Sequence, residues 1–466
     1  LVNFTQSAAV DTDFASILSP GARSATTVVS PRSFANEPQQ EGLYFSVGYQ
    51  NSDLLGADFS IQAYFAQEDL VQIGTDISAA GLPPIFPSFF QTSSEEESYG
   101  LRSDLRFNVT DALRLNLGLD YRTEKDLSLL IISTAAGGAP AFFDGSSTVN
   151  QDPPFELETF GLFAQGTYEV TPSFRINAGL RYDYFDYTVG PSTPVFVPPP
   201  SLGFRPCGTG DGDGFSYNIG AIYDISDTTS VFASFAQGFS IPNFQLQARF
   251  VSPGVSVNDI LEPVVVDSYE VCIRGELYST EYSFAAFFAE SDLGETAQID
   301  PATGFGSIVR SPQRNYGFEF ASRTAVTSQL DVSTSIAWND GENDANNDGQ
   351  FLALSSLSVL PLNIRIRADY QVNPRLALSG SINYLASRSD ALNDGVDSLA
   401  SEEHLTVDVG LTYDIPQDRG QLSFQVTNLL NEFYLPLEST TRVGGTANRR
   451  FAAPGREMVV NYSVEF

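Results

Sequence analysis

Histidine, cysteine, tryptophan and methionine are nearly absent from this sequence, which has one His, two Cys, one Trp and one Met among 466 residues. Cys207 lies in a Gly/Asp-rich stretch and Cys272 in an alternating apolar run, so neither a disulfide framework nor a zinc site is expected. His404 has no neighbouring Cys, and a single imidazole makes a poor transition-metal site. Because a Gly-x-Ser-x-Gly elbow and a Gly-rich phosphate loop are also missing, we expect no enzyme.

Basic residues are also scarce, with 24 Lys and Arg against 57 Asp and Glu and a formal net charge of -33. This balance repels phosphate, so we expect no nucleic-acid partner. No run of 18 apolar residues is present, which excludes a transmembrane helix, and Leu1 does not open a signal peptide. A chain that starts at Leu rather than Met is expected to be processed or truncated.

What the sequence has instead is period-two alternation of apolar and polar residues from about Gly42 onward. Four runs show it clearly: Leu113–Tyr121, Phe174–Tyr182, Leu362–Tyr370 and Leu405–Tyr413. The runs are longer than the usual strand of roughly five or six residues and suit a tilted membrane crossing. The 36 Phe and 20 Tyr are more rings than a soluble core needs, and they favour aromatic girdles at membrane interfaces.

The connections between these runs alternate in length. Tight turns are predicted at Val109–Ala112, Val170–Ser173, Ser226–Thr229, Val372–Arg375 and Pro416–Gly420. Long polar segments are predicted near 67–97, 124–154, 188–213, 238–262, 294–312, 339–352, 387–402 and 435–456. Short periplasmic turns and long extracellular loops are typical of outer-membrane barrels. We therefore predict an all-β, antiparallel transmembrane β-barrel in the bacterial outer membrane, in contact with its lipid.

We count about seventeen strands, the first near 43–50 and the last near 457–466. Bacterial single-chain barrels have even numbers, so the odd count indicates a missing strand. We interpret residues 1–41 as the irregular remnant of an extracellular loop and residues 42–466 as the barrel domain. The last strand carries the alternating apolar face Met458, Val460, Tyr462, Val464 and Phe466. This end resembles the carboxy-terminal signature that outer-membrane proteins present to the barrel assembly machinery.

Five segments past Ser216 follow one another in the order of known landmarks of TonB-dependent siderophore receptors. They are Val231–Asn243 with its Gln-Gly-Phe and Pro, Val266–Gly275 with Ser-Tyr-Glu, Arg314–Glu319 with Tyr-Gly-x-Glu, Leu422–Tyr434 with an Asn-Leu box, and Gly455–Arg456. Cys272 stands where the family commonly has Gly. The arrangement most resembles receptors for ferric hydroxamate or citrate-hydroxamate siderophores such as aerobactin.

This resemblance implies a receptor that binds a ferric siderophore outside and passes it inward with energy from TonB. Members of the family carry a plug inside a 22-stranded barrel, preceded by a box that engages TonB, and neither is found in residues 1–41. We expect the chain to be a fragment that covers about seventeen of the 22 strands, and that would contact TonB only through the missing plug. A plugless variant is the alternative.

Lumen carboxylates alternate with arginines, which predicts a salt-bridged wall around a wet interior. The residues are Asp104, Asp120, Asp183 and Asp369 with Arg102, Arg106, Arg122, Arg181 and Arg367. Binding is therefore expected in loops held by the rigid scaffold. Ferric siderophores of the resembled class are anionic, which favours Arg and aromatic ligands. The candidates are Phe239, Asn243, Arg249, Arg310, Arg314, Arg449 and Arg450. The alternative is that these arginines neutralise an acidic surface.

One loop has a second interpretation. Asp344–Gly349 reproduces the first half of an EF-hand-type calcium loop, although its twelfth position is Ser355 rather than Glu. Asp344, Asn346 and Asp348 are therefore candidate Ca²⁺ ligands in an extracellular loop, and no other cofactor is expected. Two other functions stay open, a passive diffusion porin with a charged constriction and a surface-binding barrel used in adhesion or phage attachment.

Overall fold

The computed structural model describes residues 2–8, 39–73, 90–132, 148–150, 152–191, 207–241, 257, 262–299, 306–356, 358–397, 400–417, 419–437 and 452–464. Within these ranges the chain is nearly all antiparallel β-strand, with a short helix, α3 (Asp390–Asn393). None of the helices there is long and apolar enough to cross a membrane. The predicted all-β antiparallel fold class is confirmed.

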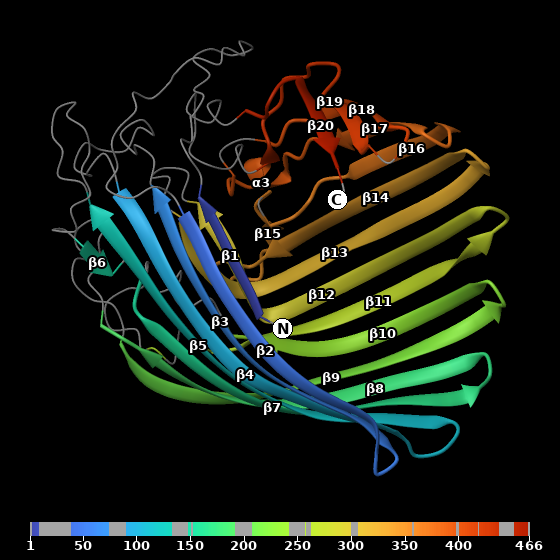
Figure 1. Cartoon of the computed structure of the whole chain (residues 1–466). Coiled ribbons are helices and arrows are strands. Elements are labelled where there is room, and N and C mark those ends of the chain that lie inside the picture. Colours follow the sequence, from blue (N-terminus) through green and yellow to red (C-terminus); the bar gives the residue numbers. More distant parts are fainter. Residues whose placement is uncertain are drawn as a thin grey trace, which may run out of the picture. The chain divides into compact units, whose positions relative to one another are not determined.

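The described residues fall into two compact units. The first unit comprises the described residues up to 219, together with 236–241, 257 and 262–265. The second unit comprises residues 220–235 and the described residues from 266 onward. In the first unit, successive strands pair antiparallel, in blue to green in Figure 1. They are β1 (Val2–Ala8), β2 (Gln39–Leu54), β3 (Ala57–Ile73), β4 (Phe90–Asn108), β5 (Leu113–Ile132), β7 (Phe155–Thr171) and β8 (Phe174–Val189), with the short β6 (Thr148–Asn150) on β5. Strands β9 (Gly208–Ser226) and β10 (Thr229–Ser240) contribute to both units.

The second unit continues the same antiparallel pattern. Its strands are β11 (Val264–Leu277), β12 (Thr280–Ile299), β13 (Gly306–Thr327), β14 (Leu330–Asn343), β16 (Asn363–Asn373), β17 (Leu376–Leu385), β18 (His404–Asp414), β19 (Gln421–Thr427) and β20 (Glu457–Ser463). The first two residues of β11 belong to the first unit. The two-residue β15 (Leu352–Ala353) pairs with the end of β14. All five predicted tight turns connect consecutive strands.

The alternating runs become strands whose apolar face is exposed. On β2, Val47 is 59% exposed and Tyr49 56%, whereas Ser46 on the other face is 7% exposed. The same exposed apolar rows recur on β9 with Ile219 and on β11 with Val271. A soluble sandwich would bury these side chains between two sheets. The structure thus leaves the hydrophobic side of these strands exposed, as the alternation predicted.

The structure corrects the strand count. Of the 20 strands in the described residues, β6 has three residues and β15 two, which leaves 18 longer strands rather than seventeen. The additional strand is β1, which pairs with β2 from Val2↔Phe45 to Ala8↔Gln39, in a segment that we expected to be irregular. Seven residues with weak alternation carry little local signal, and the pairing comes from the edge that β2 offers. The argument from an odd number of strands therefore fails.

Candidate ligand-binding site

Paired charges cover the polar face of β4, β5 and β8 in the first unit. Arg181 bridges two carboxylates, with Nη1 2.5 Å from Asp120 Oδ2 and Nη2 2.6 Å from Asp183 Oδ1. Arg102 Nε lies 3.1 Å from the other oxygen of Asp120. The predicted salt-bridged wall is confirmed here. Since these carboxylates are already paired with guanidinium groups, they form a charged surface and not an acid/base pair.

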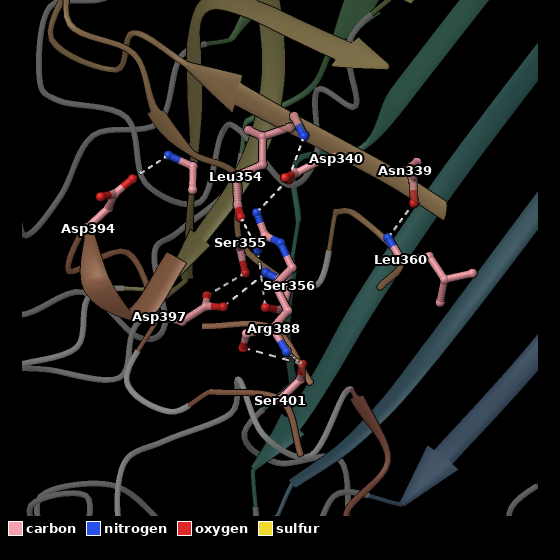
Figure 2. A network of polar contacts seen from close by, with 12 residues as sticks. Asn339, Asp340, Leu354, Ser355, Ser356, Leu360, Arg388, Asp394, Asp397 and Ser401 are labelled. Atoms are coloured by element: carbon pink, nitrogen blue, oxygen red, sulfur yellow. Dashed lines mark hydrogen bonds and ion pairs between the residues drawn. The ribbon is translucent and has the colours of Figure 1, made fainter. Parts of the chain in front are cut away.

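In the second unit, the strand ends opposite the short turns carry a packed polar network (Figure 2). Its centre is Arg388, whose side chain is 5% exposed. Arg388 Nη2 donates to Asp340 Oδ1 at 2.9 Å, and Nη1 donates to the carbonyl of Leu354 at 2.8 Å. A buried guanidinium is stable only when it is paired and hydrogen-bonded, and Arg388 thereby ties β14 to two loops.

Two aspartates complete the network. Asp397 accepts hydrogen bonds from Ser355 Oγ at 2.7 Å and from the backbone N–H of Ser356 at 2.9 Å. Asp394 accepts one from the N–H of Ala353 at 2.8 Å. Leu354, Val359 and Ala391 are buried beside them. We call the described residues of 352–361 and 386–401 the loop platform, because these contacts make the two connections one packed body.

Arg314, a predicted ligand, lies next to this platform on β13. Its guanidinium carbon is 4.1 Å from the centre of the Phe351 ring, and its Nη1 is 3.4 Å from Glu342 Oε1. The side chain is still 44% exposed. A guanidinium stacked on an aromatic face keeps its in-plane N–H groups available for an anion. Arg310, also predicted, is half-buried on the same strand and is in register with Glu295.

The predicted calcium loop follows β14 directly. Both carboxylate oxygens of Asp344 accept backbone N–H groups, from Asp348 at 3.0 Å and from Gly349 at 2.8 Å. Asp344 is 5% exposed, whereas Asn346 and Asp348 are exposed. Within the described residues, no group of three or more His, Cys, Asp or Glu could hold a metal ion. The loop thus closes through its own hydrogen bonds, and calcium binding stays a prediction.

Phe239 belongs to a different environment, in the first unit. It packs against a buried apolar cluster of Leu157, Phe185, Tyr187, Val189 and Val257. Its ring centroid is 6.4 Å from that of Phe185, which is 1% exposed. The structure therefore gives Phe239 a packing role at the end of β10 in the first unit, whereas Arg310 and Arg314 belong to the second.

The other predicted ligands, Asn243, Arg249, Arg449 and Arg450, lie outside the described residues, as does Phe466. Sequence reasoning missed Arg388, Asp340, Asp397 and Phe351. Arg388 is an isolated arginine in a polar loop, and no periodic pattern distinguishes it from a solvated residue. The only available signal was that several aspartates lie near Arg388 in the sequence, and many exposed loops have the same feature.

The Asn-Leu box of the sequence forms a structured corner after β19. Asn428 donates from its backbone N–H to Asp408 Oδ1 at 2.9 Å and from Nδ2 to the carbonyl of Glu432 at 2.8 Å. His404 stacks on Tyr434 with ring centroids 4.0 Å apart. These contacts are structural, and they explain why a short polar motif marks this position.

Comparison with known proteins agrees with this architecture. Residues 3–429 match the family model described as TonB dependent receptor-like, beta-barrel. The chain is 23% identical over 449 residues to the rhizobactin receptor of Rhizobium meliloti, covering 91% of this chain and 58% of that receptor. It is 24% identical over 470 residues to the ferric aerobactin receptor of Klebsiella pneumoniae, covering 92% of this chain and 61% of that receptor. The chain thus spans about three fifths of the length of these curated relatives.

Solved structures show the same fold. The copper transporter OprC superposes with a TM-score of 0.73 at 15% identity, covering 91% of this chain and 64% of that chain. The ferric citrate transporter FecA superposes with a TM-score of 0.68 at 14% identity, covering 91% and 61%. Together with the exposed apolar strand faces, these matches confirm the predicted family and location. The chain belongs to the TonB-dependent receptor-like β-barrel family of outer-membrane proteins.

Proposed function

We propose that the chain is the membrane part of a receptor that binds a ferric siderophore at its outer surface for TonB-dependent uptake. The related receptors are named for rhizobactin and ferric aerobactin, which supports this ligand class. Uptake itself, the contact with TonB and the absence of any catalysed reaction are part of the proposal.

The observation that carries the proposal is the preorganised guanidinium of Arg314. It stacks on Phe351, is half-exposed, and lies beside a loop platform fixed by the Arg388–Asp340 ion pair and by the hydrogen bonds of Asp394 and Asp397. Holding a binding group in place before the ligand arrives lowers the entropy lost on binding. An Arg fork on an aromatic surface suits planar carboxylate or hydroxamate anions.

Ferric aerobactin is the probe for the test, titrated against the purified, folded chain and followed through the fluorescence of Trp338, the only tryptophan in the sequence. Arg314→Ala should raise the dissociation constant about tenfold or more, since a hydrogen bond to a charged group contributes about 1.5–3 kcal/mol. Arg323→Ala is the matched control, because Arg323 lies on the same strand with its own carboxylate partner, Asp331, at 3.3 Å. Equal affinity of both variants and the parent would contradict the proposed site.

A further inference from the structure

Two hairpin tips on the short-turn side carry large, fully exposed side chains in the left-handed backbone region. Leu55, between β2 and β3, has φ 57° and is 101% exposed. Tyr278, between β11 and β12, has φ 56° and is 93% exposed. In each hairpin the strands end one residue before the tip, at Leu54 and Leu277.

Hairpin geometry alone does not account for these residues. Two-residue turns need positive φ, and Gly or Asn meets that need with little strain. A bulky side chain there is an outlier that costs conformational energy, and full exposure of its apolar surface to water adds to the cost. A strained residue of this kind points to an interaction that offsets the cost.

The surroundings of each tip indicate what that interaction is. The exposed apolar face of β2 runs through Val47 and Tyr49 to Leu54, which is 37% exposed. On β11 the exposed face runs through Val271 to Leu277, and each of these two is 60% exposed. In an outer-membrane protein such faces contact lipid, and the short turns lie on the periplasmic side. Each tip is therefore continuous with a lipid-facing surface.

We infer that Leu55 and Tyr278 insert into the headgroup–acyl boundary of the periplasmic phospholipid leaflet and anchor their hairpins there. Tyr suits this layer because its ring is apolar and its hydroxyl stays hydrated, and a Leu side chain gains by leaving water. The tip residues Thr228 and Gln417 of other short turns are polar, so anchoring is a property of particular hairpins.

The single tryptophan of the sequence allows a direct test. In a Trp338→Phe background, which keeps a ring beside Phe318, a new tryptophan is placed by Leu55→Trp, Tyr278→Trp or Gln417→Trp. Gln417 is the matched control because it is exposed, has φ 67° and lies in a short turn. In phosphatidylcholine vesicles with brominated acyl chains, residues 55 and 278 should give blue-shifted, strongly quenched emission, and residue 417 should emit like tryptophan in water.

Equal quenching at all three positions, or water-like emission at 55 and 278, would overturn the inference. Leu55→Asn gives a second measurement that does not introduce a tryptophan. Asn relieves the strain of positive φ. If the tip of the hairpin lay in water, the substitution should therefore leave the midpoint of thermal unfolding of the protein unchanged or raise it. Leu55→Asn should instead lower the midpoint in vesicles, while Gln417→Asn leaves it unchanged or raises it. A raised midpoint for Leu55→Asn would also exclude lipid contact.

Discussion

At the scale of single residues, Arg388 of the second unit is buried and held by several hydrogen bonds. Its guanidinium replaces contacts with water by hydrogen bonds to Asp340 and to the carbonyl of Leu354. Removing one partner of a buried pair leaves the other desolvated, which is the costly case. Arg388 therefore controls the order of the loop platform, beside which Arg314 is the proposed ligand-binding residue.

Arg388→Ala should loosen the loop platform without unfolding the strands. The free energy of local opening should fall by about 3 kcal/mol, the low end for breaking a buried ion pair. Amide hydrogen exchange of Leu354 and Ser356 measures this change. Arg367→Ala is the control, because Arg367 forms an exposed pair with Asp369 at 2.6 Å. Unchanged protection of Leu354 in Arg388→Ala would contradict the role given to this guanidinium.

The calcium prediction is also decided at single residues. Adding Ca²⁺ to the parent should raise its thermal midpoint if Asp344, Asn346 and Asp348 bind the ion, and the double variant Asp344→Ala, Asp348→Ala should lose this shift. Asp344 caps two backbone N–H groups, so the double variant should also melt earlier without calcium. A parent whose midpoint is the same with and without Ca²⁺ would end the calcium interpretation.

At the scale of strands, aromatic rings on the polar face of the first unit lie over glycines of the neighbouring strand. A Cβ at Gly118 would be 2.2 Å from the Phe163 ring, and one at Gly100 would be 2.7 Å from the Tyr64 ring. A ring that covers a neighbouring glycine supplies packing that the glycine lacks. These pairs hold the register of long strands at points where the backbone carries no side chain of its own.

Gly118→Ala should therefore destabilise the fold by about 1–3 kcal/mol, the usual cost of overpacking. Gly48→Ala is the matched control on β2, because the nearest atom to its Cβ would be Ile61 O at an ordinary 3.5 Å. Urea unfolding in lipid vesicles measures both variants. Equal midpoints for the two variants would show that the Phe163 ring moves aside without cost.

At the scale of the whole molecule, the chain exposes apolar rows while carrying a formal net charge of -33. In a soluble protein this combination would leave large hydrophobic surfaces in water. In an outer-membrane protein such rows are the surface expected to contact lipid. The charges pair on the polar strand face, as Arg181 does with Asp120 and Asp183. The composition thus suits strands that have lipid against one face and water against the other.

Val47→Arg should then lower stability in a bilayer by about 2–4 kcal/mol, the cost of a cation on the lipid face near the midplane. Gln62→Arg is the control, since Gln62 is the neighbour of Gly48 on the polar face of β3. Unfolding in vesicles of both variants distinguishes the two faces. A tolerated Val47→Arg together with a damaging Gln62→Arg would reverse the assignment of the faces.

The sequence by itself determined the strands, the tight turns, the polarity of the faces and the salt-bridged wall. The strands, the polarity of their faces and the salt-bridged wall repeat every two residues, so period-two alternation indicates them. The tight turns lie at the short breaks between the alternating runs. The family resemblance added an expected ligand class. The strand β1 was missed because its seven residues alternate weakly.

The tertiary structure alone decided how the loops are built and which candidate residues meet. Arg388 and Asp340 are 48 positions apart, and no local pattern links them. The structure also placed Phe239 in a packed cluster and Arg314 on an open aromatic surface, a distinction that residue types cannot make. The reason is physical: alternation follows from the backbone pleat of each strand, whereas loop contacts depend on how distant side chains satisfy one another's charge and hydrogen bonds.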